Sequence, residues 1–254
     1  MQFEYTPVPN KAVFGENSAL KLKQEVLALG RSRVMIACTK GMVGRVQHVI
    51  NELGDMCVGI FDGAEPHCPE RVAMAALDLF KEKNADIVVA IGGGSTIGIG
   101  KAITLRTDCP NIVVATTPCG SESTPIYGML IGNHKKTGRD RKVIASTTIY
   151  DPVLTTTMSA HHTGTIGMNS LAHCVEALYA QKTSPISDLF AHEGIHALTA
   201  GLRGSIKNPN DLKAREQVLY GGMLSGYCVT LAGIAIHHKL CHVLGGHHGI
   251  PHGE

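Results

Sequence analysis

The stretch DIVVAIGGGS, residues 86–95, says most about the fold of this 254-residue chain. Asp86 is followed by five apolar residues, a pattern typical of a short strand buried on both faces of a parallel sheet. Gly92, Gly93 and Gly94 come next, and a helical pattern begins after them. A strand that turns through glycines into a helix directs backbone N–H groups and the positive helix end at one point, which suits a phosphate.

Apolar strands and amphipathic helices alternate on both sides of this stretch. We expect strands at 33–38, 58–61, 86–91 and 111–115, and helices at 18–29, 41–53 and 69–83. This alternation predicts an α/β domain with a parallel, Rossmann-like sheet covered by helices on both faces. Residues 10–15 are interpreted as a loop, and KKTGRDRKV, residues 135–143, as a solvent-exposed hairpin.

The character of the sequence changes after Asp151-Pro152. Residues 160–246 show no strand pattern but long helical stretches, at 169–180 and 213–244. We therefore expect a dinucleotide-binding α/β domain over residues 1–152 and an all-α catalytic domain over residues 153–254.

Composition excludes several classes of protein. The net charge of +2 with interspersed signs gives no basic surface for nucleic acid, and no apolar run reaches the roughly 18 residues that span a membrane. The N-terminus lacks the pattern of a signal peptide, and the eight cysteines include no CxxC pair. We expect a cytoplasmic protein with reduced thiols that binds neither nucleic acid nor membrane.

The glycine run leaves two interpretations open, a tight turn without a ligand or a phosphate-binding turn. It is neither the dinucleotide motif GxGxxG, since Ile97 replaces the last glycine, nor a P-loop. In the second case its cofactor contacts are Gly92, Gly93, Gly94, Ser95 and Thr96. The hydroxyl-rich loop TTPCGSESTPIYG, residues 116–128, follows the next strand. This loop adds Thr116, Thr117 and Thr124 to the expected cofactor contacts, and the segment after it adds Lys142.

Histidines are concentrated in the helical half of the chain. His238 and His242 are four residues apart and share a helix face, as do Asn169 and His173, while His252 follows Pro251 at an expected helix start. Three imidazoles, from His173, His238 and His252, suit Zn²⁺ or Fe²⁺ if they converge. Asn169 is a poor fourth ligand without negative charge. Any single histidine is equally compatible with a surface or hydrogen-bonded core position, which we favour for His247 and His248.

These motifs together resemble the iron-containing alcohol dehydrogenase superfamily. Its metal-dependent members have an Asp and a His four residues apart and two later histidines. Here these four positions read Asn169, His173, His238 and His252. The family's additional active-site histidine corresponds to His242, and Gly98 stands where its GGGSxxDxxK motif has Asp. Both departures, together with GMNSLAHCVEALYA (167–180) and HHKLCHVLGG (237–246), resemble the maleylacetate reductase branch.

The resemblance implies NADH- or NADPH-dependent reduction of the carbon–carbon double bond of maleylacetate to 3-oxoadipate, in the degradation of aromatic compounds. It implies a small dicarboxylate as substrate, no required metal and a homodimer. His242 is expected as the acid, with His173, His238 and His252 holding substrate oxygens beside Asn169. Thr39, in place of the Asp that often binds the adenosine ribose, suggests tolerance of NADPH. Leu154 is a further expected cofactor contact.

Two alternatives remain at this point. One is a metal-dependent alcohol or polyol dehydrogenase of the same superfamily, which would use His173, His238 and His252 as ligands. The other is an inactive nucleotide-binding fragment, because members of the family continue beyond the segment that matches residues 250–253. We therefore expect the helical domain of this chain to be incomplete, with apolar faces partly uncovered.

Overall fold

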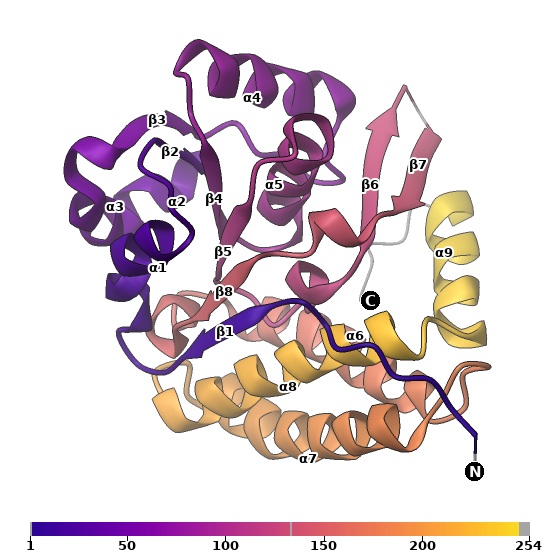
Figure 1. Ribbon diagram of the computed structural model, residues 1–254. Coiled ribbons are helices and arrows are strands. Elements are labelled where there is room, and N and C mark those ends of the chain that lie inside the picture. The colour runs from indigo at the N-terminus through magenta and orange to yellow at the C-terminus, as the bar shows by residue number, and fades with distance from the viewer. Residues whose placement is uncertain (1, 133, 249–254) are drawn as a thin grey trace. The chain divides into compact units, whose positions relative to one another are not determined.

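The computed structural model describes residues 2–132 and 134–248, and the side chains of α9 through Leu244 (Figure 1). Internal contacts divide the chain into two compact units. The sheet unit comprises Pro9–Thr116 and Pro125–Asp151, and the helical unit comprises Met1–Val8, Thr117–Thr124 and Pro152–Glu254. The helical unit thus includes two segments that a single boundary near residue 152 assigns to the first domain.

Six parallel strands form the sheet, in the order β1-β8-β5-β4-β2-β3. They are β1 (Lys11–Phe14), β2 (Val34–Ala37), β3 (Cys57–Phe61), β4 (Ile87–Gly92), β5 (Asn111–Ala115) and β8 (Thr147–Tyr150). The predicted parallel α/β sheet is confirmed. The loop predicted at residues 10–15 is wrong, because these residues contain the edge strand β1, paired with β8.

Helices cover both faces of the sheet. Within the sheet unit these are α1 (Leu22–Ala28), α2 (Lys40–Val43), α3 (Gln47–Leu53), α4 (Glu70–Glu82) and α5 (Gly94–Thr107). On one face Met35 and Val88 pack with residues of α4 and α5 such as Ile103. The alternate strand residues Ile36 and Val89 are also fully buried. Helices α1 and α3 lie on the other side of the sheet from α4 and α5 (Figure 1). Two-sided burial explains why the strands of the centre are continuously apolar.

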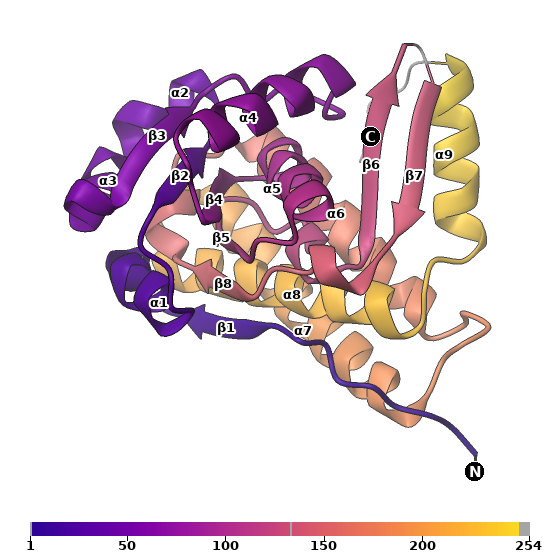
Figure 2. The same cartoon turned by 45° about the horizontal axis from the view of Figure 1, so that its top comes forward.

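A separate antiparallel ribbon follows β5. It consists of β6 (Ile126–Ile131) and β7 (His134–Arg139), and Figure 2 shows it as a narrow two-stranded element. The expected exposed hairpin over 135–143 is in part this ribbon: β7 is largely exposed, and the short 3-10 helix η5 (Arg141–Val143) follows it.

The helical unit contains the 3-10 helix η6 (Pro152–Thr155), α6 (Ala160–Ala177), α7 (Pro185–Lys207), α8 (Leu212–Leu231) and α9 (Ile236–His248). The predicted all-α second half is confirmed. Side-chain caps start three of these helices: Ser159 for α6, Ser184 for α7 and Asp211 for α8. The single helix predicted at 213–244 is wrong, because the chain breaks after Leu231 at Gly233, whose φ of +86° favours glycine.

No single helix in the described part of the chain is long and apolar enough to cross a membrane. Only α8 and α9 taken together, bent by 100°, pass such a test of length and composition.

Candidate active site

The glycine turn between β4 and α5 offers an anion-binding site in the sheet unit. Gly92 has a φ of +157°, and a Cβ there would lie 2.5 Å from Thr96 Oγ1, so a side chain does not fit. Gly93 is the N-cap of α5, and no side chain caps this helix. The N–H groups of Gly94, Ser95 and Thr96 are therefore available to an anion at the positive end of a 14-residue helix.

This turn lies where ligands bind in open parallel sheets. The strand order reverses between β2 and β4, because β3 lies outside β2 whereas β5 and β8 lie beyond β4. Thr39 follows β2, and Thr116 follows β5 and donates its N–H to the Gly92 carbonyl at 3.1 Å. Thr39, the glycine turn and Thr116 therefore share the carboxyl edge of the sheet at its topological switch point.

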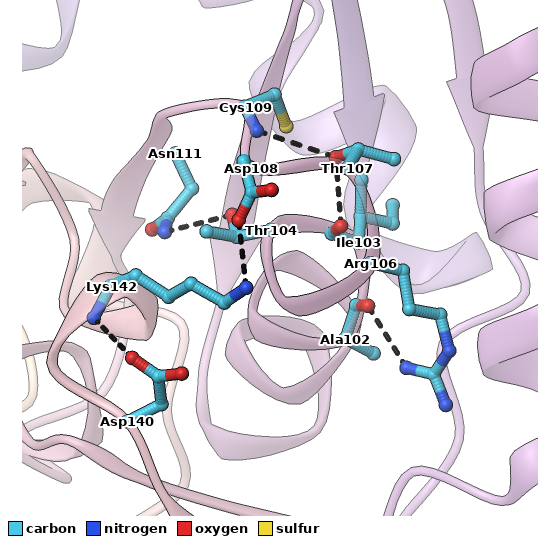
Figure 3. Close-up of polar contacts among 10 residues, drawn as sticks. All are labelled: Ala102, Ile103, Thr104, Arg106, Thr107, Asp108, Cys109, Asn111, Asp140 and Lys142. Atoms are coloured by element: carbon cyan, nitrogen blue, oxygen red, sulfur yellow. Dashed lines mark hydrogen bonds and ion pairs between the residues drawn. The ribbon is translucent and has the colours of Figure 1, made fainter.

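Lys142 lies at the other end of α5 from the glycine turn, and its predicted contact with a phosphate or ribose stays a prediction. Its Nζ binds Asp108 Oδ1 at 2.7 Å, and Asp108 is the C-cap of α5 (Figure 3). The glycine turn is at the other end of this helix. Since α5 rises about 1.5 Å per residue, the side chain of Lys142 does not reach the turn. The hydrogen bond from Lys142 to Asp108 raises the pKa of Lys142, whose ammonium group remains charged.

We expect Lys142→Ala to leave the affinity for NADH within about twofold of the original, because the lost contact is an exposed ion pair. Calorimetric titration of both proteins with NADH measures this. A tenfold loss of affinity for NADH would show that Lys142 contacts the cofactor.

Three further predicted cofactor contacts belong to the helical unit. Thr117 is buried, and its Oγ1 has no hydrogen-bond partner among the described residues, as expected of a group that awaits a ligand. Thr124 donates its hydroxyl to the Ser121 carbonyl at 3.0 Å. Leu154 is half-buried in η6. Their contact with a cofactor stays a prediction.

A compact polar cluster occupies the junction of α6 and α9 in the helical unit. Asn169, His173 and Glu176 lie on one face of α6, because they are spaced by four and three residues. His238, the third residue of α9, stacks its ring on that of His173, with centroids 3.6 Å apart and planes 8° from parallel. Its Nε2 lies 3.2 Å from Asn169 Oδ1, so the structure brings three of the predicted site residues together.

Glu176 is the member of this cluster that sequence reasoning missed. Its Oε2 lies 2.6 Å from His238 Nδ1, and its Oε1 accepts the backbone N–H of His238 at 3.0 Å. Both side chains are almost fully buried. The available signal was a carboxylate seven residues after Asn169 on the same helix face.

Burial and hydrogen bonding set the charges of this pair. Burial raises the pKa of Glu176, but the N–H groups of His238 outweigh this effect and lower it below its ordinary value. Desolvation lowers the pKa of His238 against the opposing influence of Glu176. Near neutral pH the pair is therefore an ionised carboxylate and a neutral imidazole.

This charge pattern predicts acid sensitivity of the helical unit. Unfolded His238 binds a proton more readily than folded His238, so its contribution to the free energy of unfolding is complete above its ordinary pKa of 6.5. This contribution of His238 is lost as the pH falls from 6.5 through the lowered pKa of the folded state. Below pH 4.5, protonation of Glu176 reduces the free energy of unfolding further. We expect the free energy of unfolding in urea to depend less on pH in His238→Asn than in the original protein, over the range from pH 6.5 down to the lowered pKa of folded His238. The same pH dependence in both proteins would contradict this.

Among the described residues, the cluster is poorly suited to a metal ion while residue 169 is an asparagine. Ligand atoms of His173, Glu176 and His238 lie within 4.8 Å of one another. However, imidazole lone pairs lie in the ring plane, and the nearly parallel planes of the two stacked rings do not converge on one point. Both oxygens of Glu176 are already bound to His238, and Asn169 supplies no charge.

Of the remaining predicted site histidines, the structure describes the side chain of His242. The His242 ring is exposed on α9, with its centroid 6.3 Å from that of His238. His252 lies outside the described residues, and the side chains of His247 and His248 are not described.

Taken together, the two units define a class: an α/β nucleotide-binding domain followed by an all-α domain with a buried histidine cluster. The family model for iron-containing alcohol dehydrogenase matches residues 9–152, and the model for the C-terminal part of this family matches residues 163–254. The chain belongs to the iron-containing alcohol dehydrogenase family, an oxidoreductase family.

Several relatives of this chain at about 40% identity are maleylacetate reductases. Maleylacetate reductase of Sphingobium indicum is 43% identical over 254 residues, which are 100% of this chain and 72% of that protein. The crystal structure of maleylacetate reductase from Agrobacterium tumefaciens has a TM-score of 0.97 and 39% identity, and covers 100% of this chain and 72% of that chain. Sulfoacetaldehyde reductase from Bifidobacterium kashiwanohense, solved with NAD⁺, has a TM-score of 0.93 at 25% identity, with 100% and 73% covered.

Proposed function

We propose that this chain reduces the carbon–carbon double bond of maleylacetate to 3-oxoadipate with NADH or NADPH, in the degradation of aromatic compounds. Similarity to several maleylacetate reductases, at 37–43% identity, supports this substrate. The structural observation that carries the proposal is the uncharged amide of Asn169 beside the neutral ring of His238. A carboxylate at residue 169 would repel a dicarboxylate, whereas an amide can donate to it.

In the proposed reaction, hydrogen-bond donors can stabilise the negatively charged intermediate in place of a metal ion. A bound reduced nicotinamide would supply hydride to the alkene carbon β to the ketone and would itself be oxidised. The negative charge would then lie on the ketone oxygen of an enolate, and a proton added to the carbon α to the ketone would complete the reduction. Hydrogen-bond donors aimed at the enolate oxygen stabilise this intermediate. Asn169 is such a donor, and a histidine is a suitable acid near neutral pH.

We further propose that the sheet unit binds the cofactor through the glycine turn and that the helical unit holds the substrate. Thr39, at the end of β2, carries no charge that would repel a 2′-phosphate, which is why NADPH is proposed beside NADH. The metal requirement is proposed to be absent, because Asn169 and the stacked rings suit ligation poorly. The homodimer, the cytoplasmic location and the lack of nucleic-acid or membrane partners stay predictions.

The test is a substrate comparison. The chain is incubated in one reaction with maleylacetate and NADH, and in a second reaction with a small diol and NAD⁺. The absorbance of NADH is followed in both. We expect oxidation of NADH with maleylacetate and formation of 3-oxoadipate. Diol oxidation that depends on added Fe²⁺ or Zn²⁺ would favour a metal-dependent alcohol dehydrogenase. Binding of NADH without turnover of either would favour an inactive nucleotide-binding protein.

A further inference from the structure

One buried side chain holds two helices of the helical unit together at the polar cluster. Glu176 projects from α6: one carboxylate oxygen accepts the backbone N–H of His238 at 3.0 Å, and the other lies 2.6 Å from the ring Nδ1. The backbone N–H of Ala235 also binds this carboxylate. The first turn of a helix presents N–H groups without intrahelical acceptors. Glu176 therefore caps α9 from a neighbouring helix.

The cap holds α9 at a buried side chain of this helix. Ile236, Leu240 and Val243 are exposed, so few of the described apolar side chains of α9 are buried. His238 is the exception, at 1% exposure, and it is the residue that Glu176 binds twice. The double contact fixes both the position of the His238 backbone and the rotation of its ring.

The hydrogen-bond pattern also fixes where the ring proton lies. An ionised carboxylate only accepts, so the hydrogen bond to Glu176 places the proton of the neutral ring on Nδ1. The lone pair is then on Nε2, which faces the Asn169 amide at 3.2 Å. Two acceptors do not bond, and amide oxygen and nitrogen are interchangeable by a flip. The consistent arrangement turns the Asn169 NH₂ group toward Nε2.

We propose that Glu176 is a positioning residue: by fixing the Nδ1–H tautomer of His238, it orients the Asn169 amide so that its second N–H serves a substrate oxygen. The chain of contacts runs from carboxylate to imidazole to amide, and the stacked His173 ring keeps the imidazole plane in place. The catalytic part of this inference rests on the proposed reduction, but the tautomer does not.

Glu176→Gln tests the chain of contacts without a change of volume. A glutamine that keeps the backbone N–H of His238 on its oxygen presents NH₂ to the ring, which moves the ring proton to Nε2 and turns the Asn169 amide around. We expect kcat for maleylacetate to fall about 10- to 100-fold, as for other residues that orient an active-site group, with KM changed less than about threefold. Glu193→Gln, an exposed site on α7, is the matched control.

Glu176→Asp distinguishes an effect of the His238 tautomer from an effect of the volume that Glu176 fills. Aspartate is shorter but keeps the charge and the Nδ1–H tautomer, so we expect it to retain more activity than Glu176→Gln. If Glu176 acts only by filling space, the isosteric glutamine should be the better replacement, and the proposal fails. Thermal unfolding of each variant shows whether it is folded.

The tautomer itself is read by NMR of the full chain with ¹⁵N-labelled histidine, which distinguishes protonated from unprotonated ring nitrogens. We expect Nδ1–H for His238 in the original protein and Nε2–H in Glu176→Gln. Nε2–H in the original protein overturns the proposal whether or not any variant folds. Nδ1–H without turnover of maleylacetate would refute the proposed substrate while the tautomer assignment stands.

Discussion

We expect Gly93→Asp to weaken NADH binding strongly and to leave the sheet unit folded. Gly93 is the N-cap of α5 with φ −104° and ψ −157°, a conformation that aspartate adopts readily. Its carboxylate would accept the N–H groups of Ser95 and Thr96, which the pyrophosphate otherwise binds. Like charges about 4 Å apart at an effective dielectric of about 20 repel by about 4 kcal/mol, so we expect affinity to fall by at least roughly 100-fold.

The matched control is Gly93→Asn, which has the same shape and cap preference but no charge. We expect it to bind NADH more tightly than Gly93→Asp, and both variants to keep the original stability within a few tenths of a kcal/mol. Calorimetry with NADH and urea unfolding measure the two effects. An unchanged affinity in Gly93→Asp would show that the glycine run is only a turn.

We expect Asn169→Asp to give the polar cluster affinity for a metal ion and to impair the proposed reduction of maleylacetate. Aspartate has no N–H for the lone pair of His238 Nε2, so two acceptors face each other at about the present 3.2 Å. A bound cation relieves this arrangement, and carboxylate with imidazole is a ligand set that suits Zn²⁺ or Fe²⁺. We expect metal affinity to rise by roughly 100-fold, because the new ligand carries a full charge. Turnover of the dicarboxylate should fall by at least about tenfold through repulsion.

Asn169→Leu, similar in size and without a ligand atom, is the control for loss of the amide alone. It should lose activity without gaining metal. Elemental analysis after incubation with Zn²⁺, and kinetics with maleylacetate, are measured on all three proteins. Equal metal content in Asn169→Asp and the original protein would mean that residue 169 does not share a site with the histidines.

The centre of the fold is predictable from sequence because burial on both faces makes its strands continuously apolar. The prediction at 111–115 coincides with β5, and that at 86–91 lies within one residue of β4 at both ends. β1 escaped prediction because it is a short, partly exposed edge strand whose partner, β8, is far along the chain. Periodicity alone also could not place the break between α8 and α9, since apolar spacing continues across Gly233.

In the candidate site too, local features are predictable from sequence and contacts between distant residues are not. The glycine turn and the spacing of Asn169 and His173 are local features, so sequence indicates them directly. The role of Glu176 depends on His238, which reaches it from another helix, and no local pattern records that contact. The ion pair of Lys142 with Asp108 joins residues that are distant in sequence, so it too left no local pattern.

The central claim, a dicarboxylate reductase that works without a metal, is tested most directly by measuring metal content and turnover on one preparation. The chain is dialysed against a chelator, its Fe and Zn are quantified, and NADH oxidation with maleylacetate is followed before and after metal is added back. The account predicts less than about 0.1 metal ion per chain, full turnover in that state and no gain from added metal. Turnover that vanishes on chelation and returns in proportion to bound Fe²⁺ or Zn²⁺ would contradict it.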